Sequence, residues 1–209
     1  MLLNNKPINN MVKKITQNMS KKDEILKVGM EVFADEFYHE ATIAAIAEKA
    51  GVAEATIYEY FRNKEDLLFS IPNEKMKEVI SLAHLHLQGI KGALNKIRKF
   101  VWLYLWVYEN NPKWASVVML NLKTNKRFIN TPGYQLFKDL IKIVSDTVEE
   151  GKLEGSIRKE INGYAFRSML LGTIEHITMR WLILHKPEKL TSAYEEIADL
   201  LIEAVKVRD

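Results

Sequence analysis

The sequence predicts an all-α protein of about nine helices: a three-helix unit with a helix-turn-helix near the N-terminus, followed by a larger helical domain. From about residue 20 onward, apolar residues recur at helical spacing, and no segment shows the alternation typical of strands. Caps and prolines divide this pattern into pieces of ordinary helix length. The 209 residues, of which 47% are hydrophobic, are enough to bury a core.

The first 19 residues are rich in Asn and Lys and lack periodicity, so we expect a mobile arm there. Met11 and Met19 are alternative starts of the chain. Ser20 and Asp23 have the spacing of a capping box, which predicts a helix from Ser20 to about Tyr38. The apolar face of this helix should cover the two helices that follow.

Residues 42–61, TIAAIAEKAGVAEATIYEYF, have the pattern of two short helices joined by a tight turn. Thr42 is a good N-cap for the first helix, and Gly51 can supply the positive φ that ends it. Such a pair is the helix-turn-helix unit, whose second helix enters the DNA major groove. A helical hairpin that only packs in a core has the same periodicity, so periodicity alone leaves both interpretations open.

The residues themselves favour the first interpretation. The runs IAEKAGV at 46–52, TIYEYF at 56–61 and NKEDLL at 63–68 resemble the TetR/AcrR family of transcriptional repressors. This resemblance implies a DNA-binding domain over residues 20–70 and an effector-binding and dimerisation domain over residues 71–209. It also implies a ligand-responsive repressor that binds a palindromic operator in double-stranded DNA as a homodimer and is released by a small apolar effector.

The resemblance implies DNA contacts from the helix-turn-helix and from the start of the next helix. The residues concerned are Thr42, Ala53, Glu54, Ala55, Thr56, Tyr58, Tyr60 and Lys64. Ala53 departs from the Ser or Thr cap usual in the family, and Ala55 from a frequent Gly. A methyl at Ala55 can contact a thymine methyl. Because Asn63 can cap the next helix, we expect Lys64 to be free to reach a phosphate.

The charge distribution does not fit this function easily. Residues 20–80 carry 13 acidic and 8 basic side chains, although the whole chain has a net charge of +3. Nucleic-acid-binding domains are usually basic. The acidic balance predicts weak non-specific DNA binding and a contribution from the three lysines of residues 1–19. It also favours the alternative function, a helical small-molecule binding or carrier protein that does not bind DNA.

Pro72 interrupts the fourth predicted helix, because a proline inside a helix removes a backbone hydrogen bond and clashes with the preceding turn. In the family this helix connects the two domains. The interruption is either a hinge or a static change of direction, and the sequence leaves both open.

The larger domain is organised around a predicted helix over about Ile90–Tyr108, which is apolar almost all round and must therefore be surrounded. Asn111 and Pro112 end it and start a short helix with proline in the first position. Further helices are predicted over about Thr131–Glu154 with Gly155 at its end, Gly163–His185 behind Asn162, and Ser192–Val207 behind a capping box of Ser192 and Glu195.

The last two helices carry more apolar surface than one chain needs, and in the family the corresponding helices of two subunits form a four-helix bundle. The predicted dimer interface comprises Phe166, Leu170, Ile174, Ile177, Trp181, Ile197, Leu200, Leu201 and Ala204. The small residues Ser168, Gly172 and Thr173 would let the helix backbones approach. A hairpin that packs only on its own chain is the alternative.

The middle helices hold many large aromatic residues, in the region that encloses the effector in the family. Ligand pockets are mostly apolar with a few polar groups. The predicted pocket comprises Trp102, Tyr104, Trp106, Tyr108, Trp114, Asn121, Phe128, Tyr134, Phe137, His176 and Arg180, with Gln135 as a further polar candidate. For each of these, plain core packing is the alternative. Residues 55–71 and these aromatics are similar to family members that sense fatty acyl thioesters and control fatty-acid metabolism; a multidrug sensor is the second possibility.

The sequence holds no catalytic motif, so we expect no enzyme activity, no cofactor and no metal site. His84 and His86 are two residues apart, which places their rings on different faces of a helix. The chain has no cysteine and no apolar run near the roughly 20 residues of a membrane span. We therefore expect a cytoplasmic protein without a membrane segment.

Overall fold

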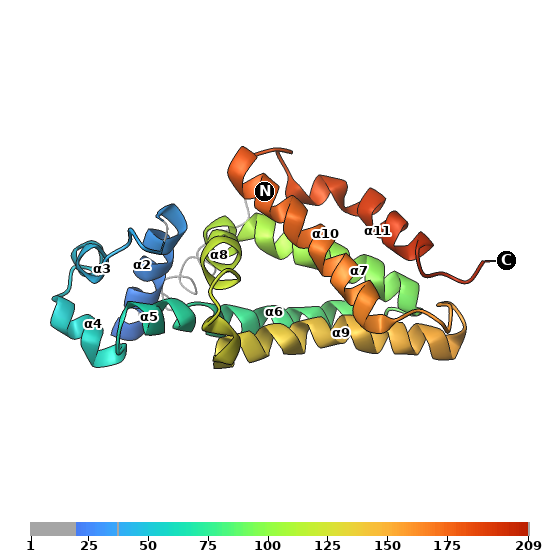
Figure 1. The fold of residues 1–209 in the computed structure, drawn as a ribbon, viewed down its shortest axis with the longest axis horizontal. Coiled ribbons are helices and arrows are strands. Elements are labelled where there is room, and N and C mark those ends of the chain that lie inside the picture. The colour runs from blue at the N-terminus through green and yellow to red at the C-terminus, as the bar shows by residue number, and fades with distance from the viewer. Residues whose placement is uncertain (1–19, 37, 209) are drawn as a thin grey trace, which may run out of the picture. The chain divides into compact units, whose positions relative to one another are not determined.

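The computed structural model describes residues 20–36 and 38–208, and most of them are helical (Figure 1). Within these residues the only pairing of extended backbone is one isolated bridge between Ile157 and Lys206. The all-α prediction is therefore confirmed. The expected N-terminal arm, residues 1–19, lies outside the described residues. The chain forms two compact units, one ending at Ile71 and the other beginning at Pro72.

The first unit consists of the helices α2 (Lys21–Asp35), α3 (Ile43–Ala50), α4 (Glu54–Tyr60) and α5 (Lys64–Ser70). Each helix contributes fully buried side chains to one core, among them Ile25, Phe33, Ile46, Ile57, Leu67 and Leu68. The first helix is shorter than predicted. It ends at Asp35, and Tyr38 stacks its ring on that of Phe33, with ring centres 6.1 Å apart.

Side chains close the helix ends of this unit as the sequence predicts. Ser20 and Asp23 form a complete capping box at the start of α2. The oxygens Thr42 Oγ1 and Asn63 Oδ1 accept hydrogen bonds from amides in the first turns of α3 and α5, at 3.0 and 2.8 Å. Gly51 ends α3 with a φ of 65°, a conformation that glycine adopts without steric cost. These interactions fix the start of α2, both ends of α3 and the start of α5.

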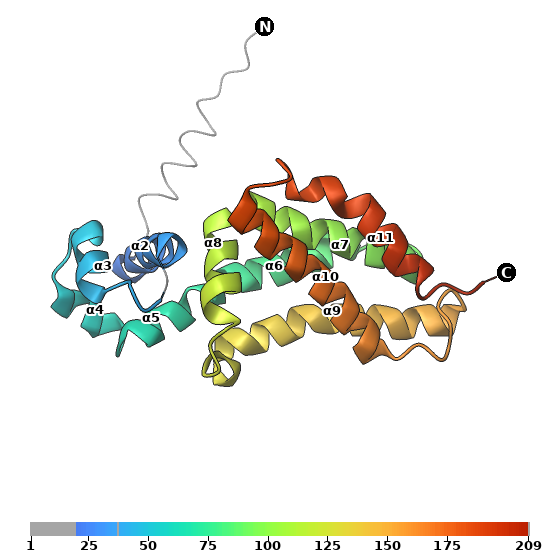
Figure 2. The same cartoon turned by 45° about the horizontal axis from the view of Figure 1, so that its top comes forward.

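The second unit consists of α6 (Pro72–Leu87), α7 (Ala93–Asn110), α8 (Pro112–Ser116), α9 (Pro132–Glu154), α10 (Gly163–Leu184) and α11 (Tyr194–Glu203), with short π- and 3₁₀-helical turns between some of them. Helix α7 is central and packs against α6, α9, α10 and α11 (Figure 2). Leu103, Tyr104 and Leu105 are consecutive on α7, so they point in different directions, and all three are buried. The prediction that this helix must be surrounded is confirmed.

The predicted interruption at Pro72 is confirmed, because α5 ends at Ser70 and Pro72, which has no N–H to continue its bonding, is the first residue of α6. The start of the last helix differs from the prediction. The predicted capping box at Ser192 does not form, because Ser192 lies in a 3₁₀ turn and α11 begins only at Tyr194. Glu109 of α7 explains this, since its carboxylate accepts hydrogen bonds from the amide and hydroxyl of Thr191 at 2.7 and 2.8 Å. This long-range contact holds the turn in place.

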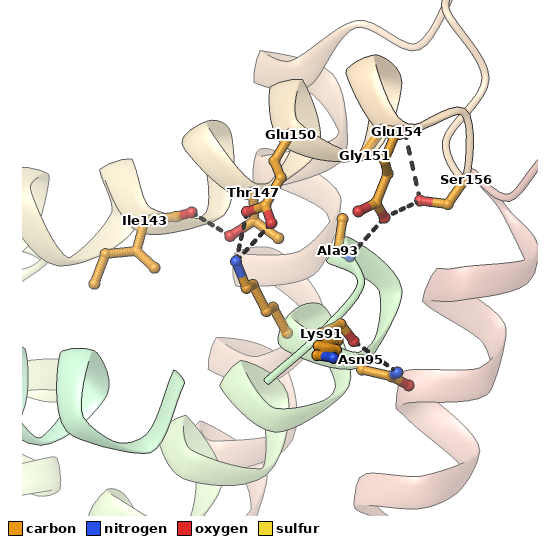
Figure 3. Close-up of polar contacts among 10 residues, drawn as sticks. Lys91, Ala93, Asn95, Ile143, Thr147, Glu150, Gly151, Glu154 and Ser156 are labelled. Carbon is orange, nitrogen blue, oxygen red and sulfur yellow. Dashed lines mark hydrogen bonds and ion pairs between the residues drawn. The ribbon is translucent and has the colours of Figure 1, made fainter. Parts of the chain in front are cut away.

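The start of α7 is capped by a side chain from far along the chain (Figure 3). Gly92 precedes α7 and offers no side-chain cap. The carboxylate of Glu154, at the end of α9, instead accepts hydrogen bonds from the Ala93 amide at 2.7 Å and from the Ser156 hydroxyl at 2.6 Å. The hydrogen bond from Ser156, and to a smaller extent that from Ala93, lowers the pKa of Glu154. The cap therefore joins α7 to α9.

Replacing Glu154 by Gln should lower the melting temperature at pH 7, because the glutamine amide oxygen is a weaker acceptor for the α7 amide than the carboxylate. A carboxyl group whose pKa is lowered in the folded state stabilises the fold above its unfolded pKa, and this contribution is lost as pH falls through the folded value. The difference between the two proteins should therefore shrink as the pH falls below the ordinary value of 4.5. Thermal unfolding followed by circular dichroism measures it. The exposed Glu188 serves as control, and Glu188→Gln should leave the melting temperature unchanged.

Candidate functional site

One side of α4 forms an exposed surface on the first unit. Ile57 is fully buried and holds α4 in the core, whereas Tyr58 is 52% exposed. Ala53 makes no side-chain cap, as the sequence predicts. Of the predicted DNA contacts in the helix-turn-helix, Thr56 is half-buried, and the exposed ones are Thr42, Ala53, Glu54, Ala55, Tyr58 and Tyr60. The surface thus combines an acidic first turn with a methyl group and phenol rings.

Lys64 is not free, and that prediction is wrong. Its ammonium group donates hydrogen bonds to the carbonyl oxygens of Tyr38 and Ala41, at 2.6 and 2.7 Å. It also lies 4.3 Å from the centre of the Tyr38 ring. The side chain therefore ties the start of α5 to the segment before α3. An ammonium group has three N–H donors, so these two bonds leave one for another partner.

Arg62, directly after α4, is an exposed cation that the sequence prediction overlooked. Its side chain is 85% exposed and pairs with Asp66 at 3.0 Å. The hydrogen bond from Arg62 is the main cause that lowers the pKa of Asp66. Lys49 similarly pairs with Glu31 at 3.2 Å. Such pairs neutralise cations of the first unit, which agrees with its acidic composition. The signal for Arg62 was its place immediately behind the second helix of the motif.

In the second unit, six of the predicted pocket aromatics form one continuous cluster, drawn from α7, α8, α9 and the 3₁₀ turn η2 (Phe128–Asn130). Neighbouring ring centres are 5.2 to 6.5 Å apart in the order Tyr104, Tyr108, Trp114, Phe137, Phe128 and Tyr134. Aromatic pairs at these separations attract one another beyond the effect of burial alone. The sequence therefore identified residues that the fold brings together.

The cluster borders a small interior void of about 10 Å³, lined by Met76, Val79, Tyr104, Val107, Tyr108, Trp114 and Leu140. This is about the room of one water molecule. Pockets for small molecules usually measure about 300–1,000 Å³. The aromatic core is thus closed in this structure, and a ligand can enter it only if the surrounding side chains or helices move apart.

Other predicted pocket residues do not line this void. Trp102 and Trp106 are half-buried and stack on each other, with ring centres 5.9 Å apart. Asn121 is buried in a π-helical turn, η1 (Val117–Leu122), that directly continues α8. Gln135 is exposed and donates a hydrogen bond to Asp139 at 2.8 Å.

His176 and Arg180 are also misplaced by the sequence prediction, because both are exposed. On α10 the positions that face the core are Phe166, Leu170, Ile174 and Thr178, which follow one another at intervals of four residues. His176 and Arg180 lie two residues away from members of this row. They therefore point away from the core of their own chain.

The predicted dimer interface is partly wrong, because several of its residues face the core of their own chain. Phe166, Leu170, Ile174 and Leu201 are at most 4% exposed and belong to the core of their own chain. Ile177, Trp181 and Ile197 are half-buried, and only Leu200 and Ala204 are exposed. A helix that is apolar on most sides does not reveal from its sequence which side faces its own core.

Helices α10 and α11 also carry exposed apolar side chains. The large ones are Met169, Met179, Ile183 and Leu184 on α10 and Leu200 on α11, between 38% and 68% exposed. Gly172 lies on the exposed part of α10, and a Cβ atom built there meets nothing within 4 Å. We call these six residues the outer face. Exposed apolar patches of this kind commonly mark interaction sites.

The described residues hold no group of three or more His, Cys, Asp or Glu side chains placed to bind a metal ion. No helix among them is both long and apolar enough to cross a membrane.

Two family models cover almost all of the chain. The model of the bacterial regulatory proteins of the tetR family matches residues 25–71. The model of the C-terminal region of YsiA-like proteins, which belongs to tetR-type regulators, matches residues 72–204. This chain belongs to the TetR family. It is a ligand-responsive transcriptional repressor, which confirms the prediction from the helix-turn-helix residues. The TetR family is made up of transcriptional regulators rather than enzymes.

Curated relatives of this TetR-family repressor include two regulators. The fatty acid metabolism regulator protein of Bacillus subtilis is 26% identical over 189 residues, which are 90% of this chain and 97% of that protein. The HTH-type transcriptional repressor KstR2 of Mycolicibacterium smegmatis is 24% identical over 152 residues, 70% of this chain and 72% of that protein.

Two solved structures resemble the repressor over most of their length. The fatty acid degradation regulator FadR from Bacillus halodurans has a TM-score of 0.80 and 27% identity, covering 88% of this chain and 96% of that one. FadR from Bacillus subtilis in complex with stearoyl-CoA has a TM-score of 0.79 and 27% identity, covering 86% and 96%.

Proposed function

We propose that this TetR-family repressor binds a palindromic operator as a homodimer through the exposed side of α4, and that a fatty acyl thioester releases it. The exposed α4 surface is the observation that carries the proposal. It belongs to a helix whose buried side is held in the core by Ile57. A helix held in this way can enter the major groove without losing its own packing.

The α4 side chains suggest how the operator is read. Glu54 can accept a hydrogen bond from the N4 amino group of cytosine, and the Ala55 methyl can contact a thymine methyl. The hydroxyls of Tyr58 and Thr42 can donate to phosphates, as can the third N–H of Lys64. Because the first unit is acidic, we expect specific contacts to supply more of the affinity than general charge attraction does. A protein acting on the chromosome in this way works in the cytoplasm.

Tyr58→Ala should weaken operator binding by roughly 13–160-fold, the range that corresponds to the ~1.5–3 kcal/mol of one hydrogen bond to a charged group such as a phosphate. The operator is first obtained by selection from random duplex DNA, and fluorescence anisotropy then gives the dissociation constants. Lys27→Ala, an exposed change on α2, is the control and should have little effect. Unchanged affinity in Tyr58→Ala would show that α4 does not read this DNA. Failure of the selection to enrich any sequence would instead favour the carrier-protein alternative.

The homodimer follows from symmetry and from the outer face of α10 and α11. One α4 per chain reads one half-site, and two half-sites related by a two-fold axis need two chains related in the same way. The outer face is apolar and includes Gly172, where another helix can approach closely. The sequence pattern predicts Leu201 in the dimer interface, but Leu201 is buried in its own chain and cannot contact a partner. Leu200, its exposed neighbour, is the better position to test.

Leu200→Glu should convert the dimer to a monomer, because an unpaired charge buried in an interface costs roughly 3–5 kcal/mol. Sedimentation velocity measures the oligomeric state. Leu153→Glu is a matched control at the end of α9: Leu153 is 90% exposed, so the same substitution there should leave the dimer intact. A folded Leu200→Glu protein that remains dimeric would place the interface elsewhere, and loss of the dimer in both variants would show a general effect of charge.

The lining of the aromatic core indicates the chemical class of the effector. The residues lining the void are apolar or aromatic and none carries a charge, which suits a long hydrocarbon chain. The Bacillus subtilis structure contains stearoyl-CoA, and this supports a fatty acyl thioester ahead of a multidrug-type ligand. Since the core is closed here, binding must expand it. We propose that the expansion is transmitted through α6, which begins at Pro72 where the two units join in sequence.

A further inference from the structure

Trp114 carries a buried hydrogen-bond donor that has no acceptor among the described residues. The side chain is 3% exposed, and its Nε1 atom is buried without a partner in that part of the chain. Buried donors are almost always paired in folded proteins, so each exception calls for an explanation. The same side chain lines the interior void. The unpaired donor therefore belongs to an indole ring that borders the place where an effector would enter.

The other two aromatic residues that line the void differ from Trp114, because their hydroxyl groups contact each other. The Tyr108 hydroxyl donates to the Tyr104 hydroxyl oxygen at 3.5 Å, and burial raises the pKa of Tyr108, so that its hydroxyl stays neutral. The ring of Trp114 is held between those of Tyr108 and Phe137, whose centres are 5.6 and 6.5 Å away. This packing fixes the indole ring, so its N–H has a defined direction.

The surroundings also restrict what the N–H can bind. The void is lined by Met76, Val79, Val107, Leu140 and the three aromatic residues, without a cationic side chain. A carboxylate placed here would be buried without a counter-charge, which is strongly unfavourable. A neutral carbonyl needs only one donor. The site therefore favours an ester or thioester carbonyl over the ionised head of a free fatty acid.

The backbone that carries Trp114 is irregular. Helix α8 passes directly into the π-helical turn η1, Val117–Leu122. π-Helical turns inside helices are frequent at functional sites. A segment that has already left regular α-helical bonding can shift with less loss of hydrogen bonds than a regular helix, which suits an element that must move when the void expands.

We propose that the indole N–H of Trp114 is the polar anchor of the effector and donates a hydrogen bond to the carbonyl oxygen of a fatty acyl thioester. This inference rests on the proposed function, which supplies the ligand class. The anchor gives an apolar site a means to distinguish an acyl thioester from a chain of equal length without a carbonyl.

A double-mutant cycle between protein and ligand tests the anchor. The protein change is Trp114→Phe, with replacement of Trp114 by 3-benzothienylalanine as a second variant that keeps the ring size and lacks only the N–H. The ligand change is from stearoyl-CoA to S-octadecyl-CoA, a thioether without the carbonyl. Isothermal titration calorimetry gives the four dissociation constants. Trp106→Phe, a half-buried tryptophan that does not line the void, is the matched control.

Loss of the N–H should weaken stearoyl-CoA binding by roughly 2–13-fold, the range expected for one net hydrogen bond, and leave S-octadecyl-CoA binding unchanged. Trp106→Phe should change neither. Equal losses for both ligands would overturn the anchor and leave Trp114 a packing residue, while the proposed effector class would stand. If the parent protein bound neither ligand, the effector class and the anchor would both be wrong. Should Trp114→Phe fail to fold, the benzothienyl variant decides by the same comparison.

Discussion

Every residue of α7 from Ile97 to Glu109 is buried or half-buried, so this helix must be covered on all sides, and the second unit is built to do so. Five helices pack against α7, and two long-range carboxylate contacts hold its ends. Glu154 caps its start, and Glu109 near its end fixes the turn before α11. The aromatic cluster then fills the remaining space between α7, α8 and α9.

This packing explains why the proposed effector site is closed. A cluster of rings around a void of about 10 Å³ stabilises the unit without ligand, and an acyl chain must replace ring contacts with its own. A ligand changes DNA affinity only by the difference between its affinities for the two conformations. Under the proposed function a closed core provides such a difference, because a ligand that enters it would change the arrangement of α7, α8 and α9.

The sequence was sufficient where the determining contacts are local. Ser20, Thr42, Gly51 and Asn63 were predictable as caps because each acts within three or four residues. It was insufficient where the partner is distant: Glu109 overrides the capping pattern at Ser192, and the carbonyls of Tyr38 and Ala41 hold Lys64. The faces of α10 could not be assigned either, since apolar residues occur on most of its sides and only the packed fold shows which row is buried.

The most direct test of this account is the operator affinity measured by fluorescence anisotropy with and without saturating stearoyl-CoA. The account predicts that the ligand lowers operator affinity by roughly 5–150-fold, the range of ordinary allosteric coupling of ~1–3 kcal/mol. Calorimetry on the same sample establishes that the ligand is bound. Bound stearoyl-CoA with unchanged operator affinity would contradict the account, because opening the aromatic core would then have no consequence for the DNA-binding unit.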